Sequence, residues 1–207
     1  MTQVAKFFSY VLHPMLMPTY MLVFLLNANS FYLLPVPTML TKYLFALIII
    51  FTIVLPVLFS VYLKKNGVIQ SLTMNTNDER KAPFLFTAGC YFAVYYVLAK
   101  TQLTLVLNIM MLGAVISLLL LILFNYKTKI SAHMVGIGGC LGTLLCLQFF
   151  LNINLLYSII FCILLCGIAG TGRLILNAHT HAQIYLGLLV GLSGQFAIFS
   201  ALKYFVH

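Results

Sequence analysis

The sequence predicts an all-α fold, a polytopic transmembrane helical bundle with about six or seven membrane helices. Of its 207 residues, 63% are hydrophobic and only 6% are charged, and the mean hydropathy is +1.12. A soluble domain carries roughly a quarter charged residues, so most of this surface must face lipid. The apolar runs also lack the alternation of apolar and polar residues that the strands of a membrane β-barrel require.

Seven apolar runs approach the length of about 20 residues that a helix needs to cross the hydrocarbon. Pro14 and Pro18 should interrupt the first predicted helix, and Pro56 should bend the second. Because connections are short, residues 1–207 are predicted to form one integral membrane domain. Glycines four apart in the fifth and seventh helices predict close helix packing. The seven runs cover 7–26, 42–63, 84–99, 103–124, 133–151, 154–171 and 183–205.

Most polar residues fall in three predicted loops, 64–83, 125–133 and 172–183. Two helices separate each loop from the next, so all three are expected on one membrane face together with the N-terminus. The positive-inside rule makes that face cytoplasmic, but both orientations stay open. Omitting five cations near the predicted site, Arg80, Lys81, Lys127, Lys129 and Arg173, leaves three basic residues against three. The full count is eight basic residues on this face and three on the opposite face. The eight are Lys6, Lys64, Lys65, Arg80, Lys81, Lys127, Lys129 and Arg173, and the three are Lys42, Lys100 and Lys203.

The net charge of +9 predicts an anionic partner. Asp78 and Glu79 are the only acidic residues of the chain, so lipid phosphate and anionic membrane lipids are favoured partners. No nucleic-acid partner is expected, because no stretch is polar enough to form a basic, water-exposed module. An ion or solute transporter is a weaker alternative, because the sequence has no inverted repeat and no buried carboxylate for a coupling cation. The five cysteines lie inside apolar runs and are interpreted as core residues.

Ionisable residues at membrane depth are costly and are mostly retained at functional sites. His133, Arg173 and His179 are predicted to converge on the polar face, and Gln183 lies one helical turn beyond His179. This set suits phosphoryl transfer through histidine. One imidazole attacks phosphorus, a second protonates the leaving oxygen, and cations hold the phosphoryl oxygens. The scheme needs no metal and no other cofactor.

Other interpretations of the same residues remain open. His133 and Arg173 are also the residue types that anchor helix ends in the headgroup region. His13, next to Pro14, either lines the same cavity or has a structural role. A metal pair at His179 and His181 is disfavoured, because side chains two residues apart on a helix point about 200° apart.

Three stretches resemble the signatures of the type 2 phosphatidic acid phosphatase superfamily, in a divergent bacterial form. Ile130-Ser131-Ala132-His133 resembles PSGH, and Gly172-Arg173, followed by His179 and Gln183, resembles SRxxxxxHxxxD. The segment 78–83 sits where the family has KxxxxxxRP. The resemblance spans residues 80–183 and leaves the first two helices uncovered.

The resemblance implies a lipid phosphatase of the bacterial inner membrane that acts through a phosphohistidine. By resemblance, His179 is the nucleophile and His133 the general acid. The phosphate-binding groups are then Arg173 and Ser131, joined by the first-signature residues Arg80 and Lys81. The chain departs from the family at Gln183, where a carboxylate is expected to orient the nucleophile. An uncharged amide stabilises an imidazolium less than a carboxylate does, so the alternative is a non-catalytic relative that binds or transports an anionic lipid.

Overall fold

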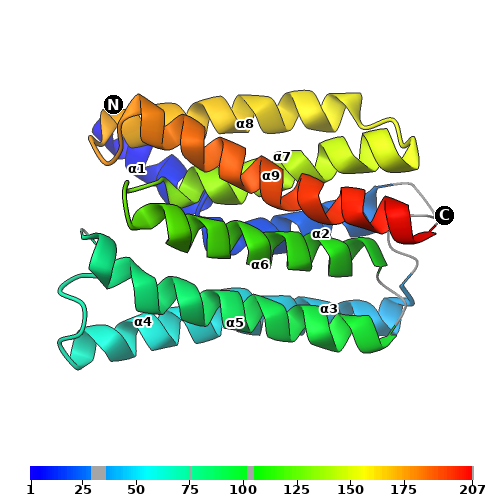
Figure 1. Ribbon diagram of the computed structural model, residues 1–207, viewed down its shortest axis with the longest axis horizontal. Coiled ribbons are helices and arrows are strands. Elements are labelled where there is room, and N and C mark those ends of the chain that lie inside the picture. Colours follow the sequence, from blue (N-terminus) through cyan, green and yellow to red (C-terminus); the bar gives the residue numbers. More distant parts are fainter. Residues whose placement is uncertain (29–35, 75, 102–104, 207) are drawn as a thin grey trace.

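Long helices run side by side along one axis of the molecule, as the computed structural model in Figure 1 shows. The structure describes residues 1–28, 36–74, 76–101 and 105–206. Within these residues, seven spans are long and apolar enough to cross a membrane, which confirms the predicted polytopic bundle. The chain is therefore an integral membrane protein. The elements are α1 (Thr2–Val11), η1 (Pro14–Leu16), α2 (Met17–Asn27), α3 (Thr38–Ile49), η2 (Ile50–Val54), α4 (Leu55–Lys65), α5 (Asn77–Thr101), α6 (Leu105–Asn125), α7 (Ala132–Leu151), α8 (Leu156–Ile175) and α9 (His181–Val206).

The first span is interrupted where the sequence predicts it. Helix α1 ends at Val11, a single 3₁₀ turn follows at Pro14–Leu16, and α2 begins at Met17. Pro14 cannot continue α1 because its ring displaces the preceding turn and its nitrogen carries no hydrogen. Pro18 is tolerated in the first turn of α2, where the backbone N–H groups have no helical partner in any case.

The second span is irregular close to Pro56, as predicted. A π-helical turn, Ile50–Val54, joins α3 to α4, and Pro56 occupies the first turn of α4. The proline removes one helical donor, and the wider π turn absorbs the resulting mismatch. Thr52 in this turn is buried, and its hydroxyl donates to the Met15 carbonyl at 3.4 Å. The two interrupted spans therefore touch at their irregular segments.

The third span begins earlier than predicted. We expected a loop through 64–83, but α5 already starts at Asn77, so that prediction is wrong over 77–83. A capping box explains the early start. The Glu79 N–H donates to the Thr76 hydroxyl at 3.4 Å, and the Thr76 N–H donates to the Glu79 carboxylate at 3.3 Å. The predicted start of the next helix, residue 103, lies outside the described residues.

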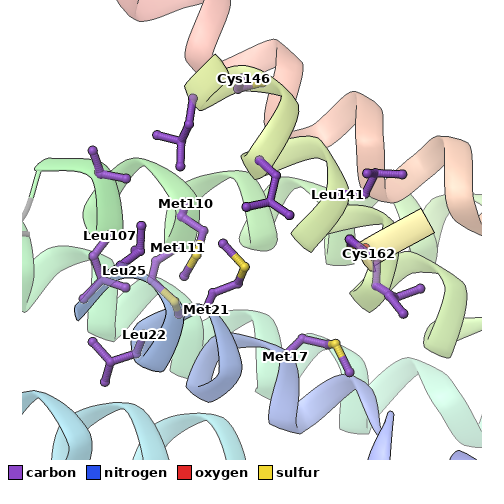
Figure 2. Close-up of a cluster of buried hydrophobic side chains, with 14 of the residues drawn as sticks. Met17, Met21, Leu22, Leu25, Leu107, Met110, Met111, Leu141, Cys146 and Cys162 are labelled. Carbon is purple, nitrogen blue, oxygen red and sulfur yellow. The ribbon is translucent and has the colours of Figure 1, made fainter. Parts of the chain in front are cut away.

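The helices form two layers, with α3, α4 and α5 beside the larger group that contains α2, α6, α7 and α9 (Figure 1). Methionine and leucine side chains from α2 and α6 fill the space between these elements, as Figure 2 shows for Met17, Met21 and Met110. Helices α7 and α9 approach very closely. A Cβ on Gly138 would lie 2.6 Å from the Leu188 carbonyl oxygen, and one on Gly187 would lie 2.7 Å from the Ser131 carbonyl oxygen. This confirms the predicted glycine packing.

The polar connections gather at one end of the bundle. The N-terminus and the α4–α5, α6–α7 and α8–α9 connections lie together at the left of Figure 1. Counting membrane crossings predicts this arrangement, because an even number of helices separates these segments. The close contact between α7 and α9 then brings the start of one helix next to the start of the other.

Candidate active site

A cavity of about 900 Å³ opens among the polar connections and continues into the bundle. His133 of α7, Arg173 of α8 and His179 of the α8–α9 connection all line it, and Arg80 of α5 joins them. Residues that are far apart in the sequence thus share one cavity wall at the polar end. Below this end the lining becomes apolar, with Met17, Leu118 and other side chains of α2 and α6.

His179 is fixed by the short connection between α8 and α9. After α8, Asn177 adopts a left-handed conformation with φ of 48°, and the Ala178 N–H donates to the Arg173 carbonyl at 3.1 Å. A second capping box starts α9. The Gln183 N–H donates to the Thr180 hydroxyl at 3.4 Å, and the Thr180 N–H donates to Gln183 Oε1 at 3.1 Å. His179 therefore sits on a rigid turn between two helix ends.

The hydrogen bonds of His179 define its tautomer. Its Nδ1 lies 3.1 Å from the Lys129 carbonyl oxygen and 3.2 Å from Gln183 Oε1. A backbone carbonyl can only accept, and Gln183 Oε1 already accepts from a backbone N–H, so Nδ1 carries the proton. The lone pair is then on Nε2, so Nε2 is the nucleophilic nitrogen of this imidazole.

His179 is held neutral. Its side chain is only 8% exposed. Burial first, and then the positive charges of Arg173 and Arg80, lower its pKa to about 4, against the opposing effect of its two hydrogen bonds. At neutral pH the Nε2 lone pair is therefore available. A histidine with the ordinary pKa of about 6.5 would be partly protonated there.

His133 is oriented by the broken helix at the N-terminus. The last turn of α1 leaves carbonyl groups without helical donors. Leu12, His13 and Tyr20 satisfy three of these carbonyls, those of Phe8, Tyr10 and Val11. The remaining carbonyl, that of Ser9, lies 3.0 Å from His133 Nε2. Because a carbonyl only accepts, Nε2 is the protonated nitrogen of His133, and Nδ1 is left for proton transfer.

The Ser9 side chain also contacts Arg173. Arg173 donates from Nη1 to the Ser9 hydroxyl at 3.2 Å, while its Nε is buried and has no hydrogen-bond partner among the described residues. His13, at the break between α1 and α2, lies beside His133 with ring centroids 5.4 Å apart and an interplanar angle of 80°. The N-terminal span thus forms one wall of the site.

Arg80 is the most deeply buried cation of the cavity, at 7% exposure. Its Nε donates to the Met74 carbonyl at 2.9 Å, and its Nη1 donates to the Ile130 carbonyl at 3.4 Å. Met74 has a left-handed conformation, with φ of 49°, which is uncommon for a residue other than glycine. The loop before α5 is therefore tied to Arg80 at the mouth of the cavity.

The cavity holds more positive charge than the chain can neutralise. Four cations line it, namely Lys6, Arg80, Lys129 and Arg173. The sequence has two acidic residues, and Asp78 pairs with Lys81 at 2.6 Å. At most one carboxylate, that of Glu79, is therefore left for these four cations, so at least three of them have no carboxylate partner in the chain. Lys6 is exposed, but Arg80 is buried, and a buried charge is costly unless it is paired and hydrogen-bonded. The charge of the cavity therefore suits an anionic ligand rather than a cationic one.

Three predicted site residues do not line the cavity. Ser131 is completely buried, and its hydroxyl has no hydrogen-bond partner among the described residues. Lys81 binds Asp78 and lies over the Tyr126 ring, 4.6 Å from its centroid. Gln183 contacts His179 through its Oε1 atom, which lies 3.2 Å from the Nδ1 nitrogen of the imidazole. Of the two first-signature cations, Arg80 alone reaches the cavity.

Sequence reasoning missed two contributors to the site. Ser9 orients His133 through its backbone carbonyl, and every residue type has such a carbonyl. The break at Pro14 indicates that some carbonyls of α1 lack helical donors, but it does not single out Ser9. Lys129 is predicted only as one of five cations near the site, with no role toward His179. Its carbonyl instead holds His179, and its ammonium lines the cavity, where burial, followed by Arg80 and Arg173, lowers its pKa. Its position beside the second signature could have drawn attention to it.

Comparison with protein-family models, with curated proteins and with solved structures gives no match for this chain. The described residues also contain no group of three or more His, Cys, Asp or Glu side chains arranged to hold a metal ion. The fold and the cavity thus define an integral membrane helical bundle with a cationic, histidine-lined cavity at one end.

Proposed function

We propose that this chain is a lipid-phosphate phosphatase or phosphotransferase that forms a phosphohistidine at His179, as a divergent relative of the type 2 phosphatidic acid phosphatases. The excess of positive charge in the cavity carries the proposal, because four cations and at most one carboxylate, once Asp78 is paired with Lys81, favour a ligand with several negative charges. A phosphate group meets this need and is attacked by a neutral imidazole. The lipid part follows from the apolar lining below the cations.

In the proposed reaction, Nε2 of His179 attacks phosphorus, and the N–P bond forms as the bond to the lipid oxygen breaks. His133, protonated on Nδ1 when the phosphate is bound, gives this proton to the leaving oxygen while its Nε2–H stays on the Ser9 carbonyl. Arg80, Arg173 and Lys129 hold the charge on the phosphoryl oxygens. Water then attacks phosphorus, His133 takes a proton from it, and the N–P bond breaks to release phosphate.

Two residues that line the cavity are also exposed on the outer surface of the protein, where a lipid could enter from the bilayer. Tyr10 of α1 is 75% exposed and Val57 of α4 is 42% exposed, yet both also line the cavity. A lipid phosphate approaching between these two helices can place its headgroup on the cations without leaving the membrane. The orientation of the bundle in the membrane, and a bacterial inner membrane as its location, remain parts of the proposal.

The second candidate is a non-catalytic protein that binds or transports an anionic lipid, and Gln183 favours it. Its Oε1 accepts from the Thr180 N–H as well as contacting His179, so a helix-capping role alone is enough to account for it. The experiment that separates the two functions is phosphate release from a panel of lipid phosphates by wild type and by Gln183→Glu, measured across pH. Glutamate keeps the length and the capping box and adds a charge.

For a phosphatase, we expect Gln183→Glu to raise turnover up to about tenfold, because a carboxylate favours the imidazolium that forms during attack. The kcat/KM of wild type should fall as pH drops through about 4, where His179 takes up a proton and loses its Nε2 lone pair. In Gln183→Glu this fall should move to higher pH, because the added negative charge raises the pKa of His179. The second ionisation of the substrate phosphate, near pH 6, is common to both proteins. If neither protein releases phosphate and the variant binds lipid phosphate more weakly, the binding function is correct.

A second expected result concerns Pro14, which frees the Ser9 carbonyl. Alanine at this position restores a backbone N–H and lets α1 continue, so the His13 N–H competes with His133 for Ser9. We expect kcat for phosphate release to fall about tenfold, with KM within about threefold. Pro18→Ala is the matched control and should behave as wild type, because Pro18 lies in the first turn of α2. Equal kcat values for both variants would show that Ser9 does not orient His133.

A further inference from the structure

The cavity continues well below the cations along one face of α7. Gly136, Gly139, Cys140 and Thr143 lie three, six, seven and ten residues beyond His133, positions that share one face of a helix, and all line the cavity. Thr143 is ten residues beyond His133, which is about 15 Å along a helix axis. Since the hydrocarbon core is about 30 Å thick, the cavity reaches about half-way across the membrane, the depth of one lipid leaflet.

The opposite walls are apolar and adaptable. Met17 and Met21 of α2 and Met110 and Ala114 of α6 line the cavity across from α7. Figure 2 shows Met21 and Met110 within one cluster of side chains from these helices. Methionine side chains are flexible and polarisable, so they fit a ligand of irregular or variable shape. An alkyl chain is such a ligand.

A polar side chain lies deep in the cavity. Gln195 of α9 is 2% exposed and lines the cavity, and its Nε2 donates to the Met110 carbonyl at 3.2 Å. Its Oε1 is buried without a hydrogen-bond partner among the described residues. Gln195 lies eight residues beyond Gly187, which is level with Ser131 at the start of α7, so it lies about 12 Å below the level of His133. The Gln195 amide nitrogen lies beside the open position at Gly139, 3.8 Å from a Cβ built there. An apolar chain end pressed against this polar group is unfavourable, so Gln195 limits the length of an apolar ligand.

We infer that this lower part of the cavity is a length-measuring slot for an unbranched alkyl chain of about one leaflet's length. The inference rests on the proposed function and names its substrate class: phosphate esters whose straight chain extends from the cations to Gln195. Gly139 is the specificity-determining residue, because it lies six residues, or about 9 Å, below His133 and leaves the slot open at that depth.

Gly139 can be tested without disturbing the packing of the helix. A Cβ built there meets a single side-chain atom within 4 Å, Gln195 Nε2 at 3.8 Å, which is an ordinary van der Waals distance. Leucine at this position therefore points its side chain into the slot. Gly167 on α8 is the matched control, because it is exposed and a Cβ there meets nothing within 4 Å.

The experiment uses n-octyl, n-dodecyl and n-hexadecyl phosphate with the purified full chain. Binding is measured as protection against thermal unfolding, and phosphate release is measured in parallel. For wild type and Gly167→Leu, dodecyl phosphate should bind at least about tenfold more tightly than octyl phosphate, and hexadecyl phosphate no more tightly than dodecyl. Gly139→Leu should bind all three like octyl phosphate. Ala114→Leu, on the opposite wall, should show the same loss.

Different outcomes contradict the alkyl-chain slot and the phosphatase function. If Gly139→Leu and Ala114→Leu keep the chain-length dependence of wild type, the slot does not hold the chain, even where phosphate is released. If binding depends on chain length as expected but no protein releases phosphate, the slot stands and the phosphatase function is wrong. Binding that is independent of chain length in wild type overturns the slot directly.

Discussion

Replacing His179 by alanine is expected to reduce phosphate release by at least about a thousandfold, while lipid-phosphate binding stays within about threefold of wild type. The reason is the division of roles in the cavity. Nε2 of His179 is the nitrogen that the bonds to Lys129 and Gln183 leave with a lone pair, whereas in the proposed function the affinity for phosphate comes mainly from Arg80 and Arg173. The measurement is single-turnover phosphate release from dodecyl phosphate, with thermal protection by the same ligand as the binding assay.

His181 supplies the control for this experiment. It lies two residues beyond His179, is exposed, and does not line the cavity, so His181→Ala should release phosphate at the wild-type rate. A phosphoryl group attached to wild type during turnover should be acid-labile, as expected for a phosphorus–nitrogen bond, and absent from His179→Ala. Phosphate release by His179→Ala at close to the wild-type rate would mean that another group is the nucleophile.

The fold follows from the sequence wherever the membrane dictates it. A span needs a fixed length of apolar residues, and prolines interrupt helices for local steric reasons, so both the spans and the break near Pro14 are predictable. The start of α5 was not predicted, because Pro83 and the charges around it resemble a loop. Thr76 and Glu79, however, have the spacing of a capping box, and this local signal is stronger than the composition of the segment.

The count of membrane crossings predicts which side chains share the site. It does not predict the backbone groups that orient them. His133, Arg173 and His179 come to one cavity because their connections share one end of the bundle. Both histidines are oriented by backbone carbonyls, those of Ser9 and Lys129, and every residue has such a carbonyl. The choice between Arg80 and Lys81 depended on where α5 begins, because neighbouring residues on a helix point about 100° apart.

The second large effect concerns the two arginines of the cavity. Replacing either Arg173 or Arg80 by methionine should weaken the binding of dodecyl phosphate about tenfold to a hundredfold, because a hydrogen bond to a charged group contributes about 1.5–3 kcal/mol. The double variant should lose nearly all protection by the ligand. Lys81→Met is the matched control, since Lys81 follows Arg80 in the sequence but pairs with Asp78 away from the cavity, and its binding should equal that of wild type.

The stability of the ligand-free protein separates a binding role from a structural one. Arg173 donates one hydrogen bond, to the Ser9 hydroxyl, and shares the cavity with the like charges of Arg80 and Lys129, so Arg173→Met should leave the melting temperature close to that of wild type while protection by ligand is lost. Arg80→Met also removes the hydrogen bonds to the Met74 and Ile130 carbonyls, so it should lower the melting temperature as well as the protection. A structural arginine would behave in the opposite way, with a lower melting temperature and unchanged protection. If Arg173→Met and Arg80→Met melt earlier than wild type and still bind dodecyl phosphate as wild type does, the positive charge of the cavity serves the fold rather than a phosphate ligand.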